Sequence, residues 1–280
     1  MVQTHYKNKD SKIITSDLSC YSDQRKSAGY SIKFCDKPGE IYTINNKTFK
    51  LQPDEVLIVN DASHVSVQIE NPESVKGICL YFDNELISDV SKTAQQSSDN
   101  NLNITEVSER TEFIEGLFKK RHLGLERFRN STFENLIDVD AEELLFPVAK
   151  KIIYHQLELK GIRNKFRTSS KSTGDELLRR VLVAREYLET NINNPVSLDE
   201  LSKHSFLSKF YLLSNFKKAF NLTPHQYHFT LRLNKARMDI QNRDISISEV
   251  ADNYGFADLA SFSKAFKKRF GTSPSKKSKI

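Results

Sequence analysis

One segment of the chain occurs twice, and this repeat restricts the fold more than any other feature of the sequence. FLSKFYLLSNFKKAFNLTP at residues 206–224 aligns with FADLASFSKAFKKRFGTSP at residues 256–274, an offset of 50 residues. Upstream, VSLDELS at 196–202 aligns with ISISEVA at 245–251 at an offset of 49, so the second copy has one extra residue in its turn. A repeat of this kind predicts two copies of one supersecondary unit. The identical pairs are Phe206/Phe256, Phe216/Phe266, Lys217/Lys267, Lys218/Lys268, Phe220/Phe270 and Pro224/Pro274.

Each copy carries the end signals of a short helix, a tight turn and a second helix. A serine followed three residues later by a glutamate forms a capping box, which satisfies free amides of the first helical turn. The turn is placed at Ser205 in one copy and Gly255 in the other. This order is the helix-turn-helix plan, and the matched caps argue against chance similarity of two amphipathic helices. The capping residues are Ser197 with Glu200, Ser246 with Glu249, Ser208, Asp258, Asn221 and Gly271.

The second helix of each copy separates into a buried stripe and an outer face. On a helical wheel Phe262, Phe266 and Phe270 form the stripe, while lysines lie on the opposite side. Such a helix fits the DNA major groove, where its first residues reach base edges and later lysines meet phosphates. The predicted DNA-contacting residues are Lys209, Phe210, Leu213, Ser214, Lys217 and Lys218 in the first copy, and Ala260, Ser261, Ser263, Lys264, Lys267 and Lys268 in the second.

Charge is distributed unevenly along the chain. Residues 174–280 contain 18 basic and 11 acidic residues, whereas residues 1–159 contain 19 basic and 25 acidic residues. A basic C-terminal part beside an acidic N-terminal part indicates a polyanionic partner for the former.

The N-terminal part shows the pattern of a β domain. Short runs rich in β-branched and aromatic residues are separated by turn formers, which predicts a small barrel or sandwich over residues 20–90. A polar loop is expected at 93–101 and helices at 105–160, where Phe113, Leu117 and Phe118 share a helical face. The predicted strands are residues 30–34, 40–45, 47–51, 55–59, 66–70 and 75–82.

These patterns together predict an α+β chain. Residues 1–162 are expected to form one domain, and the basic, serine-rich residues 163–174 a linker. Residues 175–280 form an all-α domain with two helix-turn-helix units, in which a long helix at about 225–241 joins the two copies.

The region 177–274 resembles the DNA-binding domain of the AraC/XylS transcription regulators. The resemblance is carried by GFAD at 255–258, SFSK at 261–264, FKK at 266–268, FGTSP at 270–274 and RLNKA at 232–236. It implies a bipartite DNA site, with each recognition helix in one of two successive major-groove segments on one face of the DNA. Residues 38–70 are similar to the family's N-terminal cupin-type barrel. This resemblance implies that residues 1–162 form an effector-binding or dimerisation domain, in which the helices after the barrel pair subunits.

The chain departs from the family pattern in its first recognition helix. Positions that often hold long polar residues hold Phe210, Leu213 and Ser214 here, so base readout by this copy is either apolar, at thymine methyl groups, or weak. Asn221 stands where glycine is usual, and SPSKKSKI at the end lacks the family's Tyr-Arg. The lysines of that end either contact phosphate or form a frayed tail.

Catalytic, metal and cofactor patterns were also sought in the sequence. The β region offers only His64, with Glu40 and Glu55, as a metal-ligand set, and no HxH, GxGxxG, Walker loop or GxSxG occurs. We therefore predict no enzyme, no metal and no cofactor. The cysteines Cys20, Cys35 and Cys79 provide neither a disulfide framework nor a zinc ligand set, and are interpreted as small buried residues in a reducing compartment.

The sequence as a whole predicts a cytoplasmic, sequence-specific bacterial transcription activator. Its expected partners are double-stranded promoter DNA, RNA polymerase, and a small effector or a second subunit that acts on the N-terminal domain. No run of about 18 apolar residues occurs, and the N-terminus is polar, so neither a membrane span nor a secretory signal is expected. The alternative is a non-sequence-specific nucleic-acid or protein-interaction module.

The regulatory residues of the N-terminal domain are less sharply predicted. Dimer contacts are expected on the apolar helices of 105–160, although these helices could instead pack onto the barrel. The residues expected to line an effector pocket, or else to be only core, are Phe34, Tyr42, Ile44, Leu57 and Val59.

Overall fold

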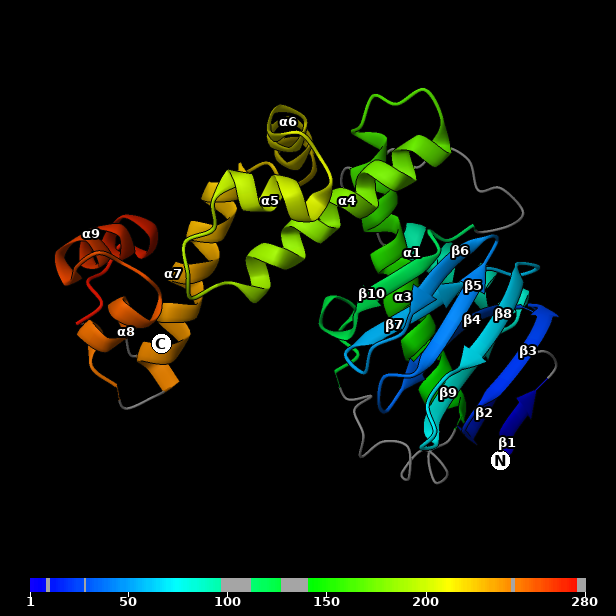
Figure 1. The fold of residues 1–280 in the computed structure, drawn as a ribbon. Coiled ribbons are helices and arrows are strands. Elements are labelled where there is room, and N and C mark those ends of the chain that lie inside the picture. Colours follow the sequence, from blue (N-terminus) through cyan, green and yellow to red (C-terminus); the bar gives the residue numbers. More distant parts are fainter. Residues whose placement is uncertain (9–10, 28, 97–111, 127–140, 243–244, 276–280) are drawn as a thin grey trace. The chain divides into compact units, whose positions relative to one another are not determined.

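A computed structural model describes residues 1–8, 11–27, 29–96, 112–126, 141–242 and 245–275 of the chain (Figure 1). The chain divides into two compact units, Met1–Lys160 and Gly161–Ile280. The first unit contains all the described strands and the second is helical, so the α+β class is confirmed. Helix α4 begins at Lys171, and therefore the last residues of the predicted 163–174 linker are helical.

Two antiparallel sheets form the N-terminal unit. The first has the strand order β1 (Val2–Asn8), β2 (Ser11–Leu18), β9 (Val75–Phe82), β4 (Tyr30–Cys35), β7 (Glu55–Val59) and β10 (Gly116–Lys119). The second has the order β3 (Tyr21–Lys26), β8 (His64–Ile69), β5 (Glu40–Ile44) and β6 (Lys47–Lys50). Among the described strands the two sheets do not join into a closed barrel, so the sandwich is the form that the chain adopts.

Alternation of side chains explains the sandwich interior. Glu40, Tyr42 and Ile44 of β5 are buried and alternate with the half-buried Ile41 and Thr43, as expected for a strand with one face in the core. Strand β4 is buried along its whole length, because both of its faces are covered. Cys35 belongs to the inter-sheet core, whereas the neighbouring Phe34 lies under Lys120, whose Nζ is 5.2 Å from the ring centre.

The remaining elements of the first unit are α1 (Asn84–Gln96), the short 3-10 helix η1 (Lys120–Leu123) and α3 (Ala141–Asn164). Gln156 of α3 exchanges hydrogen bonds with the backbone of Ile114, which precedes β10. The Phe118 ring of β10 meets the His155 ring edge-on at 5.5 Å. Helix α3 therefore packs against the segment that leads into β10.

All the predicted strands are confirmed to within two residues, but other expectations were wrong. Leu117 and Phe118 were expected on a helix but belong to strand β10, which pairs with β7. Their spacing of four and five residues from Phe113 is compatible with a helix face but does not require a helix. Strands β1, β2 and β3 were missed since they are rich in polar residues. Helix α1 extends through Gln96, which corrects the loop expected to begin at residue 93; residues 97–101 lie outside the described part.

Six helices form the C-terminal unit: α4 (Lys171–Thr190), α5 (Leu198–Ser205), α6 (Lys209–Phe220), α7 (Pro224–Asn242), α8 (Ile247–Asn253) and α9 (Leu259–Phe270), counted over the described residues (Figure 1). Phe262 and Phe266 of α9 pack with Leu233 and Ala236 of α7 and with Val250 of α8. None of the described helices in either unit combines the length and apolar character needed to cross a bilayer.

Candidate nucleic-acid interface

The predicted caps set the ends of the four helices in the repeat. Ser197 and Glu200 form a complete capping box at α5, and Ser246 Oγ accepts from the Glu249 amide at 3.1 Å at α8. Helices α6 and α9 are capped by Ser208 and by Asp258, whose Oδ1 accepts from the Ser261 amide at 2.6 Å. Both recognition helices end at left-handed residues, Asn221 and Gly271. Two helix-turn-helix units are therefore present: α5 with α6, and α8 with α9.

The turn of the first unit differs from the expected one. Its left-handed residue is Phe206, with φ 53°, rather than Ser205, and the left-handed residue of the second unit is Gly255, with φ 62°. The amide of Leu207 donates to Ser202 at 3.3 Å, and the amide of Phe256 donates to Ala251 at 3.0 Å. These bonds are equivalent at an offset of 49 residues, so Phe206 corresponds to Gly255 and not to Phe256.

An arginine from a preceding helix holds each turn. Arg180 Nη1 of α4 donates to the carbonyl of Phe206 at 2.8 Å, and Arg232 Nη2 of α7 donates to the carbonyl of Gly255 at 2.6 Å. Arg232 Nε also donates to Tyr254 O at 2.5 Å, and its guanidinium lies 4.6 Å from the centre of the Phe256 ring. The same carbonyl of each turn is thus fixed by the same residue type.

A second pair of arginines repeats in the same way. Arg185 of α4 stands 5.5 Å from the ring centre of Phe220, and Arg237 of α7 stands 4.9 Å from that of Phe270. The repeated unit therefore includes three helices, with α4 equivalent to α7. Sequence comparison missed this relationship, although Arg180, Ala184 and Arg185 recur as Arg232, Ala236 and Arg237 at an offset of 52.

The structure exposes the outer face of both recognition helices. Leu212 and Phe216 of α6 and Phe262 and Phe266 of α9 are buried, as the wheel predicts. Of the twelve predicted DNA-contacting residues, Ser214 and Ser263 are half-buried and the others are exposed. Their contact with DNA remains a prediction.

Positive charge dominates these two faces. Residues 209–220 and 259–270 contain no aspartate or glutamate. The cations are Lys209, Lys217 and Lys218 on α6 and Lys264, Lys267, Lys268 and Arg269 on α9. Lys209 makes an ion pair with Asp199 of α5 at 2.5 Å. A helix without acidic side chains can approach phosphates without charge repulsion.

Comparison with known proteins agrees with this geometry. The family described as "Helix-turn-helix domain" matches residues 201–279. A probable transcription factor, PqrA of Proteus vulgaris, is 36% identical over 93 residues, which cover 32% of this chain and 76% of PqrA. The chain belongs to the AraC/XylS family.

Other similar proteins match either about a third of the chain or most of it. The probable transcriptional regulator LumQ of Photobacterium leiognathi is 37% identical over 101 residues, 36% of this chain and 40% of LumQ. The chain thus spans less than half of LumQ. YisR of Bacillus subtilis, an uncharacterized HTH-type transcriptional regulator, is 23% identical over 245 residues, 87% of this chain and 84% of YisR. A solved structure of ToxT from Vibrio cholerae has 11% identity, covers 95% of this chain and 97% of ToxT, and has a TM-score of 0.36.

In this AraC/XylS chain the residues expected to line a pocket do not all lie together. Tyr42, Ile44, Leu57 and Val59 belong to one buried cluster between the two sheets. Phe34 points to the other face of β4, because neighbouring residues of a strand alternate. Their role in binding an effector remains a prediction.

Two buried charged residues lie beside that cluster and were missed by sequence reasoning. Lys33 and Glu40 have only 4% and 3% of their surface exposed. Lys33 Nζ lies 3.6 Å from Cys79 Sγ and 5.0 Å from the centre of the Tyr81 ring. Charged residues at inward positions of a strand carry no distinguishing pattern in a single sequence.

Burial and hydrogen bonding both affect the pKa of the Glu40 carboxyl group. Tyr42 Oη donates to Glu40 Oε2 at 2.9 Å. Burial raises the pKa of the Glu40 carboxyl to about 7, although Tyr42 and the nearby Lys33 act in the opposite direction. Gly77 makes room for this carboxyl, since a β-carbon there would lie 2.6 Å from Glu40 Oε1.

Other expectations for the N-terminal unit have mixed outcomes. His64 is exposed, and among the described residues no group of three or more His, Cys, Asp or Glu could hold a metal ion. The three cysteines are free, but only Cys35 is buried; Cys20 is exposed and Cys79 is half-buried, which corrects the expectation that all are buried.

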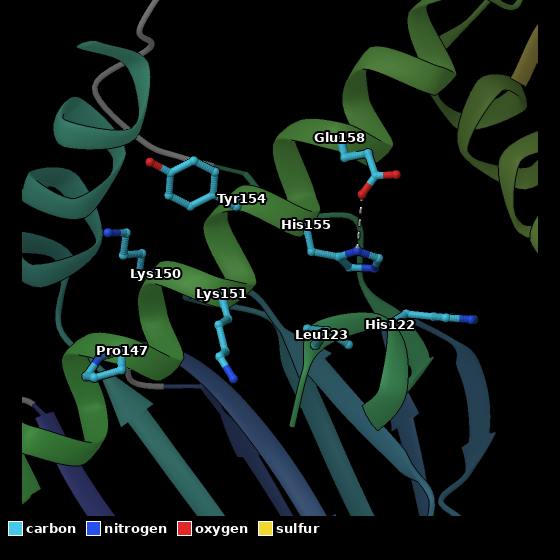
Figure 2. Close-up of a pocket in the computed structure, with 8 residues that line it drawn as sticks. All are labelled: His122, Leu123, Pro147, Lys150, Lys151, Tyr154, His155 and Glu158. Carbon is cyan, nitrogen blue, oxygen red and sulfur yellow. Dashed lines mark ion pairs between the residues drawn. The ribbon is translucent and has the colours of Figure 1, made fainter. Parts of the chain in front are cut away.

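A surface groove of about 630 Å³ runs along α3 beside η1 (Figure 2). Lys150 and Tyr154 project from α3, with the Lys150 ammonium 5.9 Å from the Tyr154 ring centre. Phe146 and Tyr154 are 47% and 37% exposed. The groove is lined by His122, Leu123, Pro147, Lys150, Lys151, Tyr154, His155 and Glu158.

Proposed function

We propose that the protein is a sequence-specific transcription activator that binds promoter DNA through both helix-turn-helix units and recruits RNA polymerase. It acts in the cytoplasm. One observation carries the DNA-binding part: the two recognition helices, α6 and α9, carry seven cations and no carboxylate. Each face begins with residues that suit base edges and continues with lysines that suit phosphates.

The positioning arginines support the same proposal. A recognition helix discriminates bases only when its orientation on the DNA is fixed. Arg180 and Arg232 each bind the carbonyl of the left-handed turn residue that precedes the recognition helix. Such a brace limits rotation of α6 and α9 against the helices that carry them.

The N-terminal unit is proposed to regulate DNA binding, through a small effector or through pairing of two subunits. The inter-sheet core beside Lys33 and Glu40 is the candidate effector region. For pairing, the candidate surface is the exposed face of α3, where Phe146, Lys150 and Tyr154 recur every four residues. Exposed aromatic residues on a helix face favour association.

A salt titration of the full chain tests the proposed DNA-binding function. Fragments enriched by the protein from a random DNA library are compared with unselected DNA of the same length at physiological salt. A sequence-specific regulator prefers the enriched fragments by at least about a thousandfold. Equal affinity for both DNAs, with only a steep salt dependence, would instead identify a non-specific binder.

Pairing is tested separately by light scattering on the full chain after size exclusion. Tyr154→Glu should shift a dimer towards the monomer mass, whereas Glu70→Gln, at an exposed position outside α3, should not. A wild-type chain that is monomeric at all concentrations, with and without DNA, would contradict pairing through α3.

A further inference from the structure

The first helix-turn-helix unit holds a bulky residue in a backbone conformation that favours glycine. Phe206 has φ 53°, and its equivalent in the second unit is Gly255. The β-carbon of an L-residue is crowded in this region. The Phe206 side chain is 79% exposed, so burial of its ring does not compensate for the conformation. An exposed aromatic residue kept in an unfavourable conformation points to a role in binding.

A second exposed phenylalanine follows four residues later, at the start of the recognition helix. Phe210 lies in the first turn of α6 and is 83% exposed, and Leu213 on the same helix is also exposed. We name Phe206, Phe210 and Leu213 the apolar reading surface. The equivalent positions of the second unit hold Gly255, Ala260 and Ser263, so this surface is specific to the first unit.

The surroundings of the apolar reading surface favour DNA as its partner. Lys209, Lys217 and Lys218 lie on the same helix, and residues 209–220 contain no carboxylate. Cations around an apolar patch match a groove with phosphates at its edges. The thymine 5-methyl is the apolar group that base pairs present in the major groove. Phenylalanine is one of the side chains that contact it.

We propose that the first unit reads its half of the DNA site by packing Phe206 and Phe210 against thymine 5-methyl groups, whereas the second unit reads polar base edges through residues such as Lys264. This inference rests on the proposed DNA-binding function and adds the chemistry of one half-site. The first half-site should therefore contain thymines at fixed positions.

The test removes the methyl groups one at a time. Each thymine of a library-selected site is replaced by deoxyuridine, and binding of the full chain is measured. Footprints of Lys217→Ala and Lys267→Ala assign the two halves of the site to α6 and α9. At one or more thymines of the α6 half, loss of a buried methyl should weaken binding about fourfold.

Variants then connect each methyl group to its side chain. Phe210→Ala should bind the thymine site more weakly and lose its sensitivity to deoxyuridine at those positions. Met238→Ala, which removes an exposed apolar side chain from α7, should leave both quantities unchanged.

Phe206→Gly separates a binding role from a structural one. Glycine relieves the left-handed conformation, so the melting temperature should stay equal or rise. DNA affinity and deoxyuridine sensitivity should fall at the same time. A purely structural role for Phe206 would give a lower melting temperature with DNA readout intact, and this outcome would overturn its part in the proposal.

Other outcomes also decide the matter. Deoxyuridine effects that are absent from the α6 half, or that persist unchanged in Phe210→Ala, overturn thymine readout. Variants that keep normal DNA binding but lose activation in a purified transcription reaction assign the surface to RNA polymerase instead. A wild-type chain without preference for any selected DNA would overturn the proposed function itself. This result differs from failure of thymine readout, in which the wild-type chain still prefers its selected site.

Discussion

Arg180 donates a hydrogen bond to the backbone carbonyl of Phe206 across 2.8 Å, and this contact joins α4 to the turn that precedes the first recognition helix. Arg232 makes the equivalent bond to Gly255 in the second unit. The two turns differ in their residue but share their conformation and their brace. The brace is therefore common to both turns, whichever residue takes the left-handed conformation.

Loss of Arg232 should destabilise its turn more than loss of Arg180 destabilises the other. Arg232 is buried, makes two bonds and stacks on Phe256, so Arg232→Ala should destabilise its unit by about 3 kcal/mol. Arg180 is partly exposed and Arg180→Ala should cost about 1 kcal/mol. Hydrogen exchange of the amides of residues 250–258 and 201–208 measures each local effect.

A control and a contradicting result complete that experiment. Lys171→Ala removes an exposed cation from the first turn of α4 and should leave exchange at the Phe206 turn unchanged. Equal exchange in wild type, Arg180→Ala and Arg232→Ala would show that the arginines do not hold the turns.

The phenylalanine stripe of α9 should be structural only. Phe266 is buried against Phe262 and Phe270, so Phe266→Ala should destabilise the C-terminal unit by about 3–5 kcal/mol. Circular dichroism should then show loss of helix at a lower temperature. Arg269→Ala, on an exposed position of the same helix, serves as the control and should melt within about two degrees of wild type.

Glu40 should give the N-terminal unit a pH-dependent stability. Its folded pKa of about 7 exceeds the unfolded value of about 4.3, so the folded state binds more protons between these values. The stability of the N-terminal unit should therefore fall by up to about 4 kcal/mol as the pH rises from about 4 to about 7, and should stay level above pH 7. Glu40→Gln should remove this slope.

The pKa of Glu40 can be measured directly. In the full chain labelled with ¹³C-glutamate, one carboxyl resonance should titrate near pH 7 and be absent in Glu40→Gln. Glu70→Gln, at an exposed position, should leave that resonance in place. Titration of every glutamate below about pH 5.5 would contradict the burial effect on Glu40.

Local signals account for what was predictable from the sequence. Caps such as Ser197 and Asp258 act within three or four residues, and the alternation in β5 depends only on its own residues. Because these local signals recur in both copies of the repeat, they predicted two helix-turn-helix units and their DNA-facing helices. The outer faces of α6 and α9 could therefore be predicted residue by residue.

The features that were missed depend on residues distant in the sequence. Strand β3 is YSDQRK and is a strand because β8 pairs with it. The turn at Phe206 also has a partner on another helix, since its carbonyl accepts a hydrogen bond from Arg180 of α4. A single strand also cannot indicate that Lys33 and Glu40 are buried, since their surroundings come from other strands.

The central claim is that the lysines of the recognition helices bind DNA, and the most direct test is the affinity of charge variants for a library-selected site. Lys264→Ala and Lys267→Glu should each weaken binding by about tenfold or more and reduce the salt slope by about one, with melting temperatures within about two degrees of wild type. Lys235→Ala, on an exposed position of α7, should bind normally. Unchanged affinity in both recognition-helix variants would contradict the account.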